Sequence, residues 1–124
     1  PLLATWYAVL GLSDESAQML QKHIQNQTEL NLMSTSPPFR IDGNMVYTAA
    51  ICQNLVTHSN DGIILTPALP SAWGDGYIKG IRAKGGYNMN VYWKNKDVLV
   101  EMRNPYGGMC KIKTGKNIRV SNQG

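Results

Sequence analysis

A single carboxylate stands out in the segment 36–44, which reads Ser-Pro-Pro-Phe-Arg-Ile-Asp-Gly-Asn. Its two prolines exclude a helix interior there and stiffen the chain. Asp42 precedes an apolar stretch that is predicted to be a helix. A helix N-terminus favours an ionised carboxyl group, and so does Arg40 two residues away. An ionised Asp suits a base or a water-orienting role, but an Asp at this place can also simply cap the helix. Spacing alone leaves both interpretations open.

The other residue types that could react or bind metals indicate structural roles. Cys52 and Cys110 are the only cysteines, too few for a disulfide framework and without the spacing of a zinc site. We interpret both as small core residues. His23 and His58 lie on predicted helices without metal-ligand spacing, so we expect them to be structural and predict no metal site.

Composition excludes some classes of protein. The chain has 124 residues, 43% of them hydrophobic, and no apolar run reaches the roughly 18–20 residues of a membrane span. Residues 1–60 carry two basic and four acidic side chains, whereas residues 61–124 carry ten basic and four acidic ones. The basic residues are spread over many short segments, which favours the solvated face of a sheet over a nucleic-acid surface. We therefore expect neither a membrane nor a nucleic acid as partner.

The first half of the chain is predicted to be helical. Residues 2–10 are apolar on almost every side, which is typical of a buried helix. Residues 13–26 form an amphipathic pattern, and residues 44–58 predict a third helix with little polar surface. Two nearly all-apolar helices need more neighbours than one amphipathic helix and a small sheet can supply. We therefore expect residues 1–60 to be the last helices of a larger helical domain, with the other helices in a preceding part of the same polypeptide.

The second half changes to the alternating pattern of strands. The predicted strands are 63–65, 77–83, 87–94, 98–103, 109–113 and 118–121, with a hairpin turn at 94–97. Short, closely spaced strands favour an antiparallel sandwich, so residues 61–124 are a small β-sandwich domain and the fold class is α+β. Segment 65–73 is interpreted as the crossing between the two domains, with Trp73 in their interface. The aromatic residues of the sheet, namely Tyr87, Tyr92 and Trp93, are expected in the core or in cross-strand pairs.

Four blocks resemble the C-terminal end of the glycoside hydrolase family 95 enzymes, which are inverting α-L-fucosidases and related α-L-galactosidases. In order they are Phe39-x-Ile41-Asp42-Gly43-Asn44, Thr48-Ala49, Leu65-x-Pro67-Ala68-Leu69-Pro70-x-Ala72-Trp73 and Gly76-x-x-Lys79-Gly80-x-Arg82-Ala83-x-Gly85-Gly86-Tyr87. They cover nearly the whole chain without large gaps. The last two blocks together are specific, since no other family known to us carries both after Ile-Asp-Gly-Asn.

The resemblance implies the last helices of a catalytic (α/α)6 barrel followed by a C-terminal β-sandwich. It implies that Asp42 is the catalytic carboxylate and activates water together with asparagines from elsewhere in the barrel. A Glu from an earlier segment would be the general acid, and inversion needs the two carboxyl groups about 6.5–9.5 Å apart. No residue of this chain matches that Glu, so we expect the chain to be inactive by itself. The implied partner is a glycan, and no metal or organic cofactor is implied.

Three positions depart from the family pattern. Ser36 stands where a sugar-contacting His is usual, Arg40 where Gln is usual, and Met45-Val46 where Phe-Gly is usual. Ser36, Arg40 and Asn44 are the candidate substrate-binding residues beside Asp42. Loss of the His leaves a pseudo-enzyme as one alternative, and a non-catalytic β-sandwich that binds carbohydrate or a partner as another. The sequence encodes no compartment, and the resemblance points only to an extracellular or periplasmic location.

Overall fold

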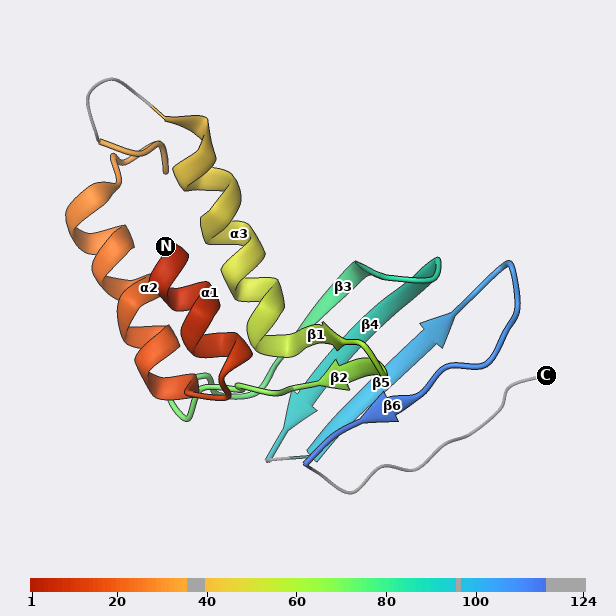
Figure 1. The fold of residues 1–124 in the computed structure, drawn as a ribbon. Helices are drawn as coiled ribbons and strands as arrows, with labels where there is room; N and C mark the ends of the chain where they lie inside the picture. The colour runs from red at the N-terminus through yellow and green to blue at the C-terminus, as the bar shows by residue number, and fades with distance from the viewer. Residues whose placement is uncertain (36–39, 96, 116–124) are drawn as a thin grey trace.

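The computed structural model describes residues 1–35, 40–95 and 97–115, and it is an α+β arrangement (Figure 1). Helices gather at one end and strands at the other, as the two halves of the sequence predict. The helices are α1 (Leu2–Val9), α2 (Ser13–Gln27) and α3 (Ile41–Leu55). The strands are β1 (Val56–Ser59), β2 (Gly62–Leu65), β3 (Gly76–Ala83), β4 (Tyr87–Lys94), β5 (Asp97–Arg103) and β6 (Ile112–Lys113).

Helix α3 differs from its prediction at both ends. It begins at Ile41 rather than Asn44, and it ends at Leu55 rather than near His58, where the chain continues directly into β1. A segment that is apolar all round fits a buried helix and a buried strand equally well, so periodicity could not place this end. Tertiary contacts place it, because the backbone N–H of Thr66 donates to the carbonyl of Leu55 at 2.6 Å.

The strands form two sheets, in the orders β1-β2-β6 and β3-β4-β5. All pairs are antiparallel except β2 and β6, which are parallel. The predicted antiparallel sandwich is therefore correct apart from β6, which is also shorter than the predicted strand 109–113. The predicted strand 118–121 lies outside the described residues. The two sheets share one core, formed by the buried residues Leu55, Val56, Ile63, Leu65, Ile81, Ala83, Met89 and Val91.

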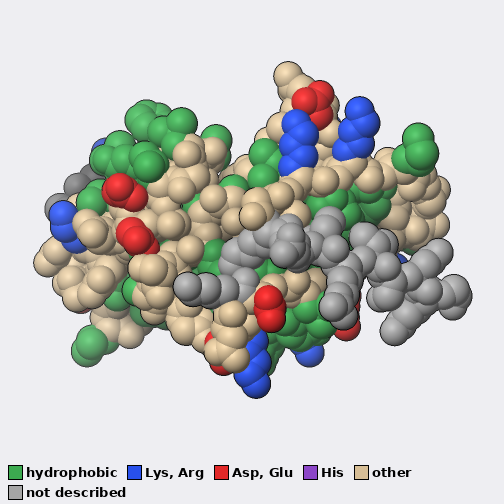
Figure 2. Space-filling view, turned by 90° about the horizontal axis from the view of Figure 1, so that it is seen from below, with side chains coloured by type: hydrophobic (Ala, Val, Ile, Leu, Met, Phe, Trp, Pro, Cys, Tyr) green, Lys and Arg blue, Asp and Glu red, His purple; other side chains and the backbone are tan. Residues whose placement is uncertain are grey.

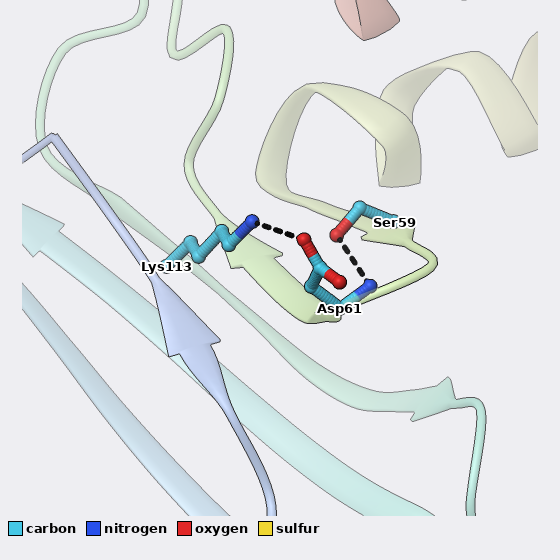
Figure 3. Close-up of polar contacts among 3 residues, drawn as sticks. All are labelled: Ser59, Asp61 and Lys113. Atoms are coloured by element: carbon cyan, nitrogen blue, oxygen red, sulfur yellow. Dashed lines mark hydrogen bonds and ion pairs between the residues drawn. The ribbon is translucent and has the colours of Figure 1, made fainter.

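Strand β6 is held against the β1–β2 hairpin at its turn. Lys113 forms an ion pair with Asp61 at 3.0 Å, and the Asp61 N–H donates to the hydroxyl of Ser59 (Figure 3). Both charged side chains are more than half exposed, so the ion pair contributes little by itself. Gly62 has φ +143°, and a Cβ there would collide with the backbone of Lys111. The close approach of this backbone therefore requires glycine.

The three helices meet through small residues and a buried hydrogen-bond chain. Ser16 donates its hydroxyl to the carbonyl of Ala4 at 2.9 Å. Asn54 donates its amide to Ser16 Oγ at 2.9 Å and to the carbonyl of Ala50 at 2.9 Å. All four residues are fully buried. The chain of bonds therefore joins α1, α2 and α3 inside the helical part of the molecule.

Helix α1 was expected to be buried with the help of helices from a preceding part of the polypeptide, and within this chain only one side of it is covered. Only Ala4 and Ala8 are buried, because α2 and α3 pack against the alanine side of the helix. The larger apolar side chains of α1 and its C-cap are 51–71% exposed, and they are Leu2, Leu3, Trp6, Val9 and Leu10. Figure 2 shows hydrophobic side chains at the surface over the helical end of the molecule. No described helix is long and apolar enough to cross a membrane.

The crossing segment, residues 65–73, does not carry the chain from the helices to the sandwich as predicted, because α3 runs directly into β1; it joins β2 to β3 and contacts both parts. Trp73 packs against both the helical core and the sandwich core. Its ring lies 6.3 Å from that of Trp93, measured between centroids. Ser71 donates its backbone N–H and its hydroxyl to Asp14 on α2, at 2.9 and 2.8 Å. These bonds lower the pKa of the Asp14 carboxyl, the backbone bond having the larger effect.

The buried chain of bonds generates a stability prediction. Ser16→Ala removes the bond from the hydroxyl to the Ala4 carbonyl and leaves one Asn54 N–H without a partner in a buried place. We therefore expect the free energy of unfolding to fall by about 1–3 kcal/mol. Urea denaturation followed by circular dichroism measures this. Ser13→Ala is the matched control, because Ser13 lies in the same helix and its hydroxyl bonds to no described residue. Equal stability of the two variants would contradict the prediction.

The Asp14–Ser71 contact generates a pH prediction. Since the folded pKa is below the ordinary value of 3.8, the contact stabilises the fold fully above that value and loses its contribution as the pH falls through the lowered pKa. We expect Asp14→Ala to lower the urea midpoint near neutral pH, and the difference from wild type to shrink in acid. Glu15→Ala, a change of the neighbouring exposed carboxylate, should show no such convergence.

Candidate functional site

Asp42 lies in the first turn of α3, at the end of that helix remote from the sheets (Figure 1). The helix N-terminus places unpaired backbone N–H groups and a partial positive charge there, which favours a carboxylate. Oδ1 of Asp42 accepts the backbone N–H of Gly43 at 3.0 Å. The side chain is otherwise exposed. The carboxylate is thus free to contact groups that lie outside the described residues.

The alternative in which Asp42 is the N-cap residue is wrong. Arg40, in extended conformation with φ −124° and ψ 111°, occupies the N-cap position, and no side chain makes a capping bond. The exposed Arg40 forms no ion pair with Asp42 among the described residues. Gly43 has an ordinary helical backbone and not a positive φ. Ser36, the position of the expected His, lies outside the described residues.

Asn44 holds the preceding loop against α3. Its Nδ2 donates to the carbonyl of Leu32 at 2.6 Å, and its Oδ1 accepts the N–H of Ser34 at 3.2 Å. Leu32 has φ +64°, a backbone conformation that costs energy for a branched side chain. Both polar atoms of the Asn44 side chain are therefore committed to positioning this loop. Spacing alone gave no indication of this role, since the loop has no regular pattern.

Three surface cavities lie away from Asp42. One of about 600 Å³ lies between the β1–β2 turn, the β3–β4 turn and the loop after β5. A second, of about 550 Å³, lies over the outer face of β3–β4–β5, and a third, of about 500 Å³, lies beside the N-terminus of α1. None of them is lined by Arg40, Asp42 or Asn44. If these residues line a pocket, chain beyond the described residues supplies its other walls.

The histidines and cysteines have structural contacts. His23 is buried, its Nδ1 donates to Oε1 of Gln27 at 3.0 Å, and its ring stacks on that of Tyr47. His58 accepts the N–H of Lys84 through Nε2 at 2.9 Å and so ties β1 to the β3–β4 turn. Both cysteines are free and half-buried, and burial raises the pKa of Cys52. No group of three or more metal-binding side chains occurs within residues 1–35, 40–95 and 97–115.

The aromatic residues of the sheet divide between its two faces. Tyr87 and Trp93 pack against the sandwich core, as predicted. Tyr92 instead faces outward and pairs across the strands with Tyr77, with ring centroids 6.2 Å apart. This outer face, where Lys79 and Glu101 also lie, was not singled out as a functional surface from the sequence. The alternation of β4 and β5 could have indicated it, because the outward positions of both strands carry polar and aromatic side chains.

Comparison with known proteins agrees with the motifs. Residues 58–124 match the C-terminal domain of glycoside hydrolase family 95. The chain is 32% identical over 110 residues to "Probable alpha-fucosidase A" of Aspergillus niger, covering 77% of this chain and 14% of that protein. It is 38% identical over 70 residues to "Alpha-L-fucosidase 2" of Arabidopsis thaliana, covering 56% of this chain and 8% of the relative. It thus spans a small part of the relatives' length. The chain belongs to glycoside hydrolase family 95.

Proposed function

We propose that residues 1–124 are the C-terminal part of an inverting glycoside hydrolase that removes terminal α-L-fucosyl, or related α-L-galactosyl, residues from glycans. The family match of residues 58–124 carries this proposal. Two of its relatives are named α-fucosidases, and both are much longer than this chain. A glycan is then the substrate, and a preceding part of the same polypeptide completes the enzyme.

In this proposal residues 1–60 are the last helices of a barrel and residues 61–124 are the sandwich that follows it. The apolar surface of α1 supports the division. Five large apolar side chains there are more than half exposed, and they form the outer side of a helix whose inner side is alanine. Leaving that much apolar surface in water is unfavourable. Further barrel helices packed on it would remove it from water.

Asp42 is the proposed catalytic carboxylate. Its exposure and its place in the first turn of α3 support the role, because a carboxylate that is exposed there can contact a water and a substrate. In an inverting mechanism this carboxylate withdraws a proton from the attacking water, while an acid on the opposite side of the sugar protonates the leaving oxygen. The acid would come from the preceding part of the polypeptide, so the chain by itself would not turn over substrate.

Ser36, Arg40 and Asn44 are the proposed pocket residues. Arg40 is exposed directly before α3, two residues from Asp42. Asn44 has both polar atoms bonded to the backbone of the loop. It would therefore act on the sugar site mainly by positioning that loop.

A chimera tests the catalytic proposal. In it residues 1–124 replace the matching C-terminal portion of the Aspergillus niger relative, and hydrolysis of an aryl α-L-fucoside is measured. We expect activity in the chimera and none in the isolated chain. Asp42→Asn in the chimera should lower kcat roughly 10²- to 10⁴-fold, the usual effect of removing a general base.

Glu15→Gln in the same chimera is the matched control, because Glu15 is also an exposed carboxylate in the first turn of a helix. It should leave the rate unchanged. An active chimera in which Asp42→Asn has no effect would overturn the catalytic role of Asp42. Turnover by the isolated chain would contradict the missing acid.

Asn44 gives a separate prediction in the isolated chain. Asn44→Ala removes two side-chain bonds to the loop, so we expect faster hydrogen exchange at the Ser34 amide and a loss of about 1–2 kcal/mol in the free energy of unfolding. Asn26→Ala is the control, since Asn26 is an exposed asparagine on α2 without such bonds. Unchanged exchange at Ser34 would show that Asn44 does not hold the loop.

A further inference from the structure

The outer face of the β3–β4–β5 sheet carries its side chains in rows. Tyr77 pairs with Tyr92, and Tyr92 pairs with Leu99, so these three form one apolar row across all three strands. Tyr77 is 68% exposed and Leu99 is 61% exposed. In the next row Asn90 pairs with Glu101. The face therefore places an exposed aromatic strip directly beside polar side chains.

A bulge in β3 completes the polar row. The pairing of β3 with β4 shifts between Ile78 and Ile81, and Gly80 adopts φ +79° there. The N–H of Gly80 donates to Asn90 Oδ1 at 3.0 Å. The bulge keeps Ile78 and Ile81 on the core face, so Lys79 stays on the outer face. Its Nζ lies 5.4 Å from the centroid of the Tyr77 ring and 5.8 Å from that of Tyr92.

The carboxylate of Glu101 is fixed by its neighbours. Its Oε2 accepts bonds from Asn90 Nδ2 at 2.9 Å and from the Tyr92 hydroxyl at 3.1 Å. These bonds, with Asn90 first, lower the pKa of Glu101. Both go to Oε2, so Oε1 keeps its own acceptor sites. A charged acceptor is thus held in one orientation at the edge of the aromatic strip, as a binding site for hydroxyl groups requires.

A groove of about 550 Å³ runs over this strip, within the size range of ligand pockets. Tyr77, Tyr92 and Leu99 line its floor. On the side of the groove away from Glu101, the lining includes three charged residues, namely Asp75, Lys94 and Asp97. The aromatic strip therefore has charged groups on both sides.

We propose that this groove and the polar row beside it form a glycan-binding site, separate from the catalytic residues. In it a pyranose ring stacks on Tyr77 and hydrogen-bonds to Glu101 and Lys79, which lie in the next row, outside the lining of the groove. One face of a pyranose presents C–H groups, which are attracted to the negative face of an aromatic ring. Its hydroxyls project sideways, where this surface has its charged groups. The choice of a glycan as ligand rests on the proposed function, and the site would hold the sugar chain of the substrate.

The surroundings of the strip favour a sugar over an apolar protein surface. The strip is one row wide, with carboxylates and ammonium groups on both sides. A flat apolar partner covering it would remove these charges from water without giving them partners, which is unfavourable. A pyranose can stack its C–H face on the aromatic strip while its hydroxyl groups hydrogen-bond to the charged side chains beside the strip.

The site can be tested by titrating the full chain of residues 1–124 with fucosyllactose and, separately, with lactose. Calorimetry and NMR of the tyrosine rings measure the binding. We expect binding of at least one of the two saccharides, with shifts of the Tyr77 and Tyr92 ring signals. Tyr77→Ala should weaken binding roughly tenfold or more, and Tyr77→Phe should retain it because the ring remains. Tyr106→Ala is the matched control, since Tyr106 is 86% exposed on a loop away from the groove.

Absence of binding to both saccharides at millimolar concentration would overturn the proposal, as would equal binding by wild type and Tyr77→Ala. Tyr77 is largely exposed, so its replacement should leave the circular dichroism spectrum unchanged. If the spectrum of the variant does change, the wild type alone still tests the site. Ring shifts that are confined to tyrosines other than Tyr77 and Tyr92 would then contradict the proposal. Activity of the chimera on an aryl α-L-fucoside is a separate readout, so a failed glycan site and a failed catalytic proposal give different results.

Discussion

The buried bonds among Ala4, Ser16 and Asn54 are the constraint on which the helical half depends. They join three helices through small, fully buried residues. A buried hydroxyl and amide would be costly without partners, so they fix which sides of the helices face one another. That choice turns the alanines of α1 inward and its large apolar side chains outward. It also sets the direction of α3, whose first turn carries Asp42.

The crossing segment transmits this arrangement to the sandwich. It ends α3 by bonding the carbonyl of Leu55, contacts α2 through Ser71, and places Trp73 between the two cores. The sheets are thus anchored to the same helices that present Asp42. The two proposed sugar sites lie on different parts of the chain, the catalytic one at the start of α3 and the binding one on the outer sheet face. One rigid connection would let both act on one glycan.

The family match and the catalytic proposal concern different parts of the chain. The match covers mainly the sandwich, residues 58–124, whereas Asp42 lies before it. The geometry around Asp42 is open, and its loop is held by Asn44. The outer face of the sheet is instead complete within this chain, since its tyrosines, Glu101 and Lys79 all lie on β3, β4 and β5.

The sequence by itself determined that helices precede strands and which family the chain belongs to, because these depend on local periodicity and on short motifs. Only the tertiary structure decided where α3 ends, that β6 runs parallel to β2, and that Asn44 bonds a loop. Each of these depends on contacts between residues far apart in the chain, such as Thr66 with Leu55. The face on which Tyr92 lies belongs to the same class: alternation shows that a strand has two faces, but packing decides which of them meets the core.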